Sequence, residues 1–394
     1  MNTNDYTAWR FDALDTWFFR EARPFDTLGA PELDSVFPPP APTVAGVVKT
    51  LIGRRAGIDW REFAPKAAAD EPRHPRFGLL GDLRLQGPFP CRDGEPLFPA
   101  PLFLLKHKEH GFRRLAIGAA VETDLGVVRL PSLPKTGDAN RDKGYKPLEN
   151  AWLTAAGLRA ALDGKELDSA MVCGADELFA PESRLGIARD NKAGTVKEGL
   201  LYQTRHIRPR DNVGLIAGVG GLQPDFPGDP GPARLGGEGR LALINIGGAS
   251  PLAALAAPKP DIDTHGLILV LLTPADLDSC WRLPKSEAVC PADRNGGAKF
   301  WECELHGVQL RVHSAVLGKP RREGGWQLAE RKPRRVEGFV PAGSAWYCTV
   351  AGGTALAEAI GKLHLRQIGD GQQLGRGLLA VGLWPRGENL ESLD

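Results

Sequence analysis

Glycine and proline are abundant in this sequence, and this limits how much of it can be regular secondary structure. Among its 394 residues are 48 glycines and 33 prolines. Together they make up about a fifth of the chain, where average usage gives roughly an eighth. The excess predicts many turns and long loops.

Length, apolar content and charge indicate a folded protein of more than one domain. At about 100 to 200 residues a domain, the length suggests two to three domains. The apolar fraction of 42% is enough to build their cores, which argues against intrinsic disorder. Lys and Arg number 49 against 48 Asp and Glu, a formal charge of +1. Such a chain is not a general polyanion binder, so anion binding would need local basic patches.

The sequence favours a cytoplasmic protein without membrane contact. No run approaches the ~18 consecutive apolar residues of a membrane span, and the first residues lack the basic and then apolar order of a signal peptide. The six cysteines are scattered without a CxxC pair, and a chain of this size needs no disulfide scaffold.

One group of cysteines could be considered as a zinc site. Zinc prefers four thiolate or imidazole ligands in a tetrahedron. Cys280, Cys290, Cys303 and His306 are the nearest set, but their outer spacings fit no zinc knuckle or ribbon. We therefore expect free thiols, and no metal or other cofactor.

Hydrophobic spacing predicts one strong helix near the start of the chain. Apolar residues fall at i, i+3, i+4, i+7 and i+8 over residues 44–52, the pattern of a helix with one buried face. Thr43 is expected to cap its N-terminus, and Arg54 and Arg55 suit its C-terminal dipole. A buried strand is predicted before it, over residues 11–19.

The remaining pattern predicts an α+β fold. Further strands are expected at residues 77–85, 101–105, 115–121, 184–189, 200–207 and 213–219, with a helix at 151–162. Residues 220–239 have almost no periodicity and are expected either to connect two domains or to form a long functional loop. Beyond them we expect strand, helix, two strands, helix and strand, at residues 267–272, from 275, 308–316, 344–350, 353–362 and 377–384.

That order is the order of the ferredoxin-like split βαβ unit, and the first half can be interpreted in the same way with larger insertions. The predicted architecture is a tandem pair of ferredoxin-like (RRM-like, βαββαβ) domains with long Gly- and Pro-rich insertions. The predicted domains cover residues 1–235 and 236–394.

Several segments, in order along most of the chain, resemble one known family. They are FFREARPF at residues 18–25, FPPPAPTVAG at 37–46, ESRLGIARDNKAGTVKEGLLY at 182–202, GGEGR at 236–240, and PAGSAWY with QLGRGLLAVGLW at 341–347 and 373–384. Together they resemble the RAMP-superfamily subunit of the CRISPR type III-B (Cmr) effector complex that lies at the 5′ handle of the crRNA. The type III-A paralogue shares this plan.

The resemblance implies two ferredoxin-like domains and no catalysis by the subunit itself. It also implies contact with the crRNA 5′ handle, a large polymerase-like CRISPR subunit as partner, and neighbouring RAMP backbone subunits in a complex for antiviral defence.

Two glycine loops are candidate RNA contacts. A residue without a side chain lets the backbone approach a phosphate, and an arginine beside it adds a forked cation. The alternative is that the glycines only form tight turns and close strand packing. The candidate residues are Gly236, Gly237, Gly239 and Arg240 in the first loop, and Gly375, Arg376 and Gly377 in the second.

The start of the predicted helix is another candidate. Its free amides at Thr43 could face a phosphate, with Lys49 on the solvent side, although an ordinary capped helix would look the same. Arg20 and Arg23 could reach this region from the end of the preceding strand. Alternatively, they pair with acidic neighbours on the surface.

Three basic clusters remain, and such clusters are usually solvated surface. They are Arg205, His206, Arg208 and Arg210; Lys319, Arg321 and Arg322; and Arg331, Lys332, Arg334 and Arg335. We favour the first cluster, through Arg205 and Arg208, as the one that follows the guide backbone.

Two other function classes are considered. A RAMP-type metal-independent endoribonuclease that processes guide precursors would need a general acid and base, commonly histidine. His206 and His364 lie near the candidate RNA segments, but neither belongs to a recognisable constellation. A stand-alone protein whose glycine loops hold a small anion is the third class. No phosphate-binding loop, HExxH or GxSxG motif supports another enzyme.

Overall fold

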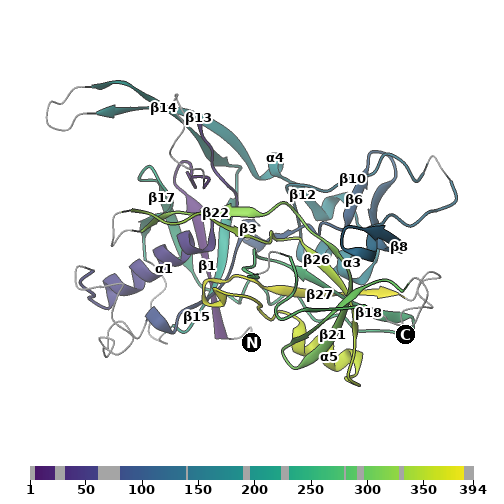
Figure 1. The fold of residues 1–394 in the computed structure, drawn as a ribbon. Coiled ribbons are helices and arrows are strands. Elements are labelled where there is room, and N and C mark those ends of the chain that lie inside the picture. Colours follow the sequence, from purple (N-terminus) through teal and green to yellow (C-terminus); the bar gives the residue numbers. More distant parts are fainter. Residues whose placement is uncertain are drawn as a thin grey trace.

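The computed structural model describes residues 5–22, 32–60, 80–138, 141–189, 196–222, 230–278, 281–290, 297–327 and 332–385. It is a strand-rich α+β structure with few helices, built around two six-stranded antiparallel sheets (Figure 1).

The first sheet belongs mainly to the N-terminal half. Its spatial order is β16 (Pro232–Arg234), β17 (Leu241–Ile246), β1 (Tyr6–Ala13), β15 (Val213–Gly220), β3 (Arg84–Arg92) and β4 (Glu95–Pro96). The four strands β3, β15, β1 and β17 are antiparallel neighbours, so in chain order they read 2-3-1-4, as in a split βαβ unit. Helix α1 (Ala41–Arg55) lies between β1 and β3 in the chain and packs on one face of this sheet.

The predicted first helix is confirmed, but its start differs from the prediction. Helix α1 begins at Ala41, Pro40 occupies the N-cap position, and no side chain caps it. Thr43 is therefore not the cap. Proline near the first turn has its φ fixed for a helix and lacks the amide that would be unpaired there, so the helix starts three residues earlier than a Thr43 cap would allow.

The second sheet has the same internal order. It runs β19 (Glu287–Val289), β20 (Phe300–Leu305), β21 (Val308–Val316), β26 (Ala345–Val350), β18 (Thr264–Leu271) and β27 (Leu379–Pro385). The neighbours β21, β26, β18 and β27 are antiparallel and again read 2-3-1-4, with α5 (Leu356–Leu363) between β26 and β27 in the chain.

The second part of the predicted strand 11–19 and the helix expected from residue 275 are wrong. Residues 17–19 form no strand beyond a single bridge from Trp17 to Ile207, since β1 already ends at Ala13. The helix expected from residue 275 is not formed over the described residues 275–278. Instead, Ala275 exchanges both backbone hydrogen bonds with Val340, which leaves the backbone extended.

The expected division between residues 235 and 236 falls inside the β16–β17 hairpin of the first sheet. The second sheet begins at Thr264, so residues 236–246 lie with the N-terminal half.

The insertions form smaller sheets and hairpins around the two sheets. One three-stranded sheet contains β5 (Phe98–Pro99), β11 (Ala151–Leu153) and β12 (Val172–Gly174), and another contains β6 (Leu104–His107), β7 (Gly111–Arg114) and β10 (Lys146–Pro147). The two-stranded pairs are β8 (Ala116–Thr123) with β9 (Gly126–Ser132), β22 (Arg321–Glu323) with β25 (Glu337–Phe339), and β23 (Trp326–Gln327) with β24 (Lys332–Pro333). The remaining short elements are helices α3 (Ala155–Asp163) and α4 (Ala175–Leu178) and the 3₁₀ turns at Ser169–Met171 and Gln372–Leu374. The long hairpin β13 (Phe179–Arg189) with β14 (Val196–Pro209), joined by β2 (Glu32–Leu33), projects from the body (Figure 1).

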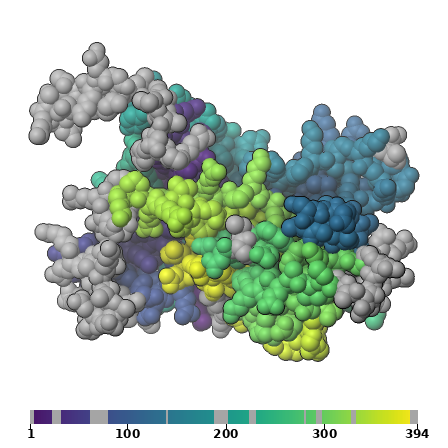
Figure 2. All heavy atoms as spheres, viewed as in Figure 1, coloured from purple at the N-terminus to yellow at the C-terminus, as the bar shows by residue number. Residues whose placement is uncertain are grey.

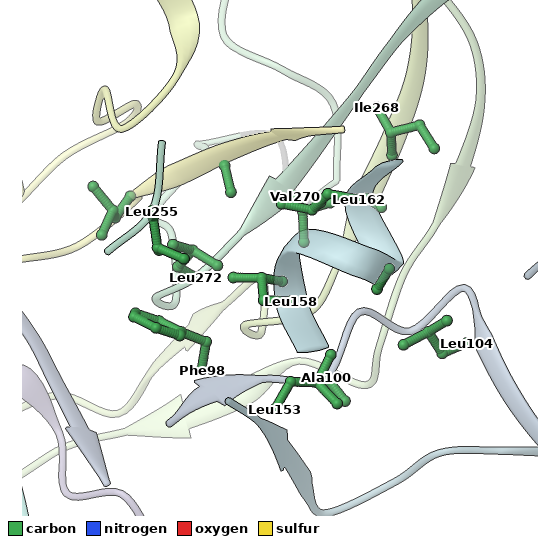
Figure 3. Packing of buried hydrophobic residues seen from close by; sticks show 14 of the residues in the cluster. Phe98, Ala100, Leu104, Leu153, Leu158, Leu162, Leu255, Ile268, Val270 and Leu272 are labelled. Carbon is green, nitrogen blue, oxygen red and sulfur yellow. The ribbon is translucent and has the colours of Figure 1, made fainter. Parts of the chain in front are cut away.

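A core shared by both halves explains why β18 is apolar at successive positions. Leu267, Leu269 and Leu271 face the side of the sheet that α5 covers. Ile268 and Val270 face the other side, where they join Leu158 and Leu162 of α3 in one cluster (Figure 3). A strand buried on both faces needs apolar residues throughout rather than in alternation.

Candidate nucleic-acid interface

The first glycine loop packs against the N-terminal segment. Gly236 has φ +88°, and a Cβ there would lie 2.5 Å from the carbonyl oxygen of Phe18. The Gly237 amide donates to that same oxygen at 2.8 Å. Only Gly239, at φ +65°, has open space where a Cβ would be. The geometry at Gly236 and Gly237 is therefore that of a tight turn and close packing, the alternative to phosphate contact.

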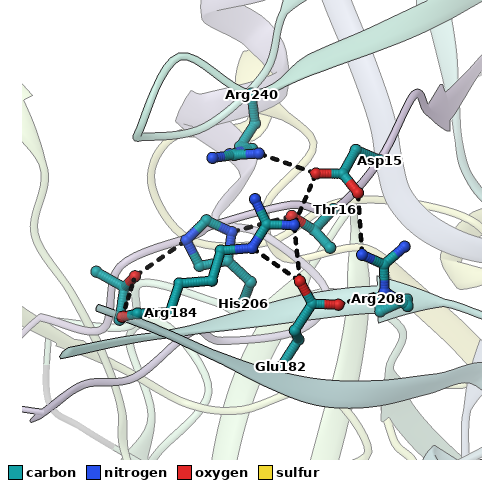
Figure 4. A network of polar contacts seen from close by, with 8 residues as sticks. Asp15, Thr16, Glu182, Arg184, His206, Arg208 and Arg240 are labelled. Atoms are coloured by element: carbon teal, nitrogen blue, oxygen red, sulfur yellow. Dashed lines mark hydrogen bonds and ion pairs between the residues drawn. The ribbon is translucent and has the colours of Figure 1, made fainter. Parts of the chain in front are cut away.

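Arg240 and Arg208 belong to a network of charges at the base of the β13–β14 hairpin (Figure 4). Asp15 accepts hydrogen bonds from Arg184 at 2.7 Å, Arg208 at 3.0 Å and Arg240 at 3.0 Å. Glu182 accepts from Arg184 at 2.8 Å and also from Arg208. Hydrogen bonds from these arginines lower the pKa of both carboxyl groups, so both stay ionised and offset most of the positive charge.

His206 lies beneath this network and is held neutral. Its ring is 1% exposed, contacts the hydroxyls of Thr16 at 3.0 Å and Thr204 at 3.1 Å, and stacks on Phe18. Burial, followed by the charges of Arg184 and Arg240, lowers its pKa to about 4. A buried neutral ring with both nitrogens in hydrogen bonds is not placed to act as a general acid or base on RNA.

His364 is also committed to the fold. Its Nδ1 accepts from the Val381 amide at 3.1 Å, and its Nε2 donates to the Leu255 carbonyl at 3.0 Å. Burial lowers the pKa of His364 to about 4. Neither histidine considered for a nuclease is therefore placed for catalysis.

The favoured basic cluster is largely neutralised. Arg205 forms ion pairs with Glu32 at 2.6 Å and Asp34 at 3.3 Å, across the β14–β2 contact. Since Arg208 pairs with Glu182 and Asp15, both arginines that the sequence favoured already have carboxylate partners.

The residues predicted around the helix start are dispersed. Arg23 lies outside the described residues. Arg20 forms a backbone bridge to Ser35, and burial lowers its pKa. Lys49 is half-buried in the middle of α1, where burial lowers its pKa, so it does not lie at the helix start with Thr43.

The second glycine loop joins the two halves of the molecule. Gly375 has φ +90°, and a Cβ there would lie 2.5 Å from the carbonyl oxygen of Gly87 in β3. Thr273 donates to the Gly375 carbonyl at 2.7 Å and accepts from the Leu378 amide at 3.0 Å. Gly377, at φ +68°, has the Ile368 backbone directly against it, so a side chain would not fit. This loop is also a packing element.

Arg376 is buried between that loop and strands β22 and β25. Its guanidinium donates to Glu323 at 2.7 Å and lies 3.8 Å from the centre of the Phe339 ring. Arg321 forms an ion pair with the other oxygen of Glu323 at 3.1 Å and donates to the Pro38 carbonyl at 2.6 Å. A buried carboxylate between two guanidinium groups connects the last loop to the segment that precedes α1.

A surface hollow of about 390 Å³ opens above this pair. Residues 321–327 and 332–339 lie along the surface in lime green, next to the yellow C-terminal residues, in Figure 2. The lining residues are Pro42 of the first turn of α1, Glu323, Gly324, Lys332, Pro333, Arg334, Arg335, Glu337, Phe339 and Arg376. Its four basic side chains outnumber its two carboxylates, and Glu323 is already paired.

The hollow brings together residues from separate sequence predictions. Their distance along the chain gave no sign that they lie side by side. Arg376 and the start of α1 were expected to contact RNA, and both line it. Lys332, Arg334 and Arg335 belong to a basic cluster that the sequence showed but did not favour. The only signal for them was local charge, because their neighbours Pro42 and Arg376 are distant in the chain.

The described residues show no metal site and no membrane helix. No three His, Cys, Asp or Glu side chains among them are grouped to hold a metal ion, and Cys280 of the considered zinc set lies outside them. Burial raises the pKa of the Cys303 thiol to about 11. Within the described part, no helix is long and apolar enough to span a membrane.

These observations define a class: a strand-rich α+β protein with two antiparallel sheets of 2-3-1-4 order and a basic hollow beside the first turn of α1. A family model described as CRISPR-associated protein (Cas_Cmr3) matches residues 9–384. The chain therefore belongs to the Cas_Cmr3 family, the CRISPR type III-B Cmr complex subunit. Among curated proteins, none matches the sequence significantly.

Solved structures of related complexes are similar to this chain. A chain of the type III-B Cmr-beta complex bound to cognate target RNA and AMPPnP has 16% identity over 86% of both chains, with a TM-score of 0.44. A chain of the Csm3–Csm4 subcomplex of the type III-A interference complex has 10% identity over 86% of this chain and 92% of that one, with a TM-score of 0.35. A chain of the Csm1–Csm4 cassette in complex with AMPPNP has 14% identity over 97% of both, with a TM-score of 0.32.

Proposed function

We propose that this chain is the non-catalytic RNA-binding subunit of a type III effector ribonucleoprotein and recognises the 5′ handle of the crRNA. We interpret its two sheets as tandem ferredoxin-like units whose shared edge carries the RNA site. In the complex the chain docks the large polymerase-like subunit and neighbouring RAMP backbone subunits, with antiviral defence in the cytoplasm as the setting.

One observation carries the proposal: the basic hollow beside α1. Lys332, Arg334 and Arg335 are exposed around it, and neither arginine forms an ion pair with any described residue. The first turn of α1 contains no acidic residue, so its positive dipole end adds to the same surface. Arg334 and Arg335 are therefore available for phosphates, unlike the paired arginines at the hairpin base.

The buried pair beneath the hollow supports the site rather than binding RNA directly. Glu323 is 5% exposed and Arg376 is 7% exposed. Replacing Arg376 would leave a buried carboxylate with one partner fewer and would disturb the fold. Arg376 is therefore a poor choice for a binding test, and the exposed arginines are better.

The test measures binding of a labelled 5′-handle RNA and of a scrambled RNA of equal length to the full chain. The double variant Arg334→Ala with Arg335→Ala should weaken handle binding about tenfold or more. The slope of the logarithm of the binding constant against the logarithm of the salt concentration should become shallower by about 1.4, because two phosphate contacts on a single strand are lost. The matched control is Arg54→Ala with Arg55→Ala, an adjacent arginine pair at the other end of α1.

Two results would contradict the proposal. One is equal binding of the handle and the scrambled RNA by the wild type. The other is an equal loss in the test and control pairs, because the effect would then come from net charge alone.

A further inference from the structure

A second basic surface lies on the insertion sheet formed by β10, β6 and β7. We name this surface, residues 104–114 and 141–147, the basic sheet. It projects in blue at the opposite end of the molecule from α1 (Figures 1 and 2). It contributes nothing to the hollow, and no motif in the sequence drew attention to it.

Like charges face each other across two strands of the basic sheet. Lys106 on β6 is directly opposite Lys146 on β10, and both side chains are exposed. Residues opposite each other on antiparallel strands have side chains about 5 Å apart, and like charges there destabilise the sheet. An anion between the two ammonium groups would remove that repulsion.

The lysines of the basic sheet also lack carboxylate partners. Lys106, Lys108, Lys143 and Lys146 are exposed, and none forms an ion pair with a residue that the structure describes. The carboxylate of Asp142 is used by Arg113 at 2.9 Å. This contrasts with the hairpin base, where Asp15 and Glu182 hold every arginine of the network.

Aromatic rings lie next to these lysines. Phe112 is opposite Lys106 in the register, so Lys146, Lys106 and Phe112 form one row across three strands, with the Lys106 ammonium 5.5 Å from the ring centre. Beside the row, the rings of His107 and His110 are stacked at 4.4 Å, and Tyr145 lies 5.2 Å from His107.

The histidine pair is held in place by the turn around it. The backbone amides of Glu109 and His110 donate to Nδ1 of His107 at 3.0 and 3.1 Å. Gly144, at φ +82°, leaves room for the ring, since a Cβ there would lie 2.9 Å from Nε2 of His107. The turn therefore presents fixed flat surfaces rather than mobile side chains.

We propose that the basic sheet is a contact site for single-stranded RNA, in which Lys106 and Lys146 hold a phosphodiester and the neighbouring rings stack with unpaired bases. Phosphates paired with lysines and bases stacked on aromatic rings are the two components of sequence-tolerant single-strand binding. Lysine is depleted at protein–protein interfaces, so an acidic protein surface fits this composition less well. The proposal goes beyond handle recognition, because the site requires no particular sequence.

The test uses the full chain and a labelled oligouridylate of about 12 nucleotides, a length within the usual range for one binding platform. Lys106→Ala with Lys146→Ala should weaken binding about tenfold and lower the log–log salt slope by about 1.4. Phe112→Leu should weaken binding about fivefold through lost stacking, with the charge unchanged. Lys106→Arg with Lys146→Arg should retain most of the binding.

The matched control removes two lysines elsewhere. Lys165→Ala with Lys362→Ala changes the net charge equally, and both lysines sit beside carboxylates, at 3.4 and 2.7 Å. Its binding should equal that of the wild type. The proposal is overturned if the wild type does not bind oligouridylate, or if the test and control pairs lose equal RNA affinity. It is also overturned if polyglutamate competes as well as RNA does and Phe112→Leu leaves RNA binding unchanged.

The outcome separates this proposal from the proposed function. One outcome is that the wild type shows no preference for the handle while its oligouridylate binding still depends on Lys106 and Lys146. That outcome would refute handle recognition and support RNA binding by the basic sheet. Since both lysines are exposed, unchanged thermal unfolding of the variants would exclude misfolding as the cause of any loss.

Discussion

Asp15 illustrates how one carboxylate can occupy several arginines. It follows β1 and receives hydrogen bonds from arginines on β13, on β14 and after the first glycine loop. Because the partners of Asp15 are already held in place, an RNA phosphate would have to compete with a carboxylate for each of them. The side chains of Arg334 and Arg335 are exposed, and neither forms an ion pair with a described residue.

Buried histidines should make stability depend on pH. Burial lowers the pKa of His206, His313 and His364 to about 4, from the usual 6.5. The unfolded chain therefore binds more protons than the folded chain between pH 4 and 6.5, so this stability is fully present above pH 6.5 and is lost as the pH falls toward 4. Each histidine contributes up to about 1.4 kcal/mol per pH unit in this window.

The measurement is urea unfolding of the wild type and of His364→Gln at several pH values from 7.5 to 4.5. The variant should be less stable at pH 7 because Leu255 and Val381 lose a partner, but its stability should fall less steeply with acid. An unchanged slope would show that His364 does not titrate differently in the two states.

At the scale of single elements, the helices show how two similar sequence signals have different outcomes. Thr154 caps α3, its hydroxyl accepting from the Gly157 amide at 3.1 Å. Thr43 was predicted to do the same for α1, but there a proline N-cap replaces it. The second helix was predicted to begin at residue 151, whereas residues 151–153 are the strand β11.

A threonine-to-alanine substitution should therefore change the free energy of unfolding by different amounts in the two helices. Thr154→Ala should lower the free energy of unfolding by about 1 kcal/mol, because it removes a side-chain cap. Thr43→Ala is the matched control and should change it much less, since the Thr43 hydroxyl makes no cap hydrogen bond. Chemical denaturation of both variants measures the difference. Equal costs would mean that the α3 cap contributes nothing specific.

Local hydrophobic spacing was sufficient to predict the strands and helices whose own apolar residues mark the buried face. Helix α1, the β13–β14 hairpin and β15, β18, β21 and β27 lie where periodicity indicated. The site was less predictable, because it depends on distant contacts: Arg208 and Asp15 are 193 residues apart in the chain. No local spacing shows that a carboxylate neutralises the favoured arginines, or that Arg334 lies beside α1.

At the scale of the whole molecule, the two sheets are joined by a shared hydrophobic core. Helix α3 comes from the N-terminal half, but Leu158 and Leu162 pack against Ile268 and Val270 of the second sheet. The loop at Gly375 packs in turn on Gly87 of the first sheet. The two halves therefore share apolar packing on both sides of their contact.

This arrangement predicts that neither half folds alone. A fragment of residues 264–394 would expose the face of β18 and β27 that α3 covers, including Ile268, Val270 and Ala380, all fully buried in the intact chain. Exposing this much apolar surface should make it aggregate. Co-expression with residues 1–263 should restore a soluble, stoichiometric complex, because the break at 263 lies before β18 and divides neither sheet.

The break at residue 235, where the sequence suggested a domain boundary, is the matched comparison. It separates β16 from β17 and removes β17 from β1, so fragments 1–235 and 236–394 should reassemble less well than fragments 1–263 and 264–394. Size-exclusion chromatography of the co-expressed pairs measures the yield of complex. A monomeric, cooperatively unfolding 264–394 fragment would instead mean that the second sheet forms a complete core without α3.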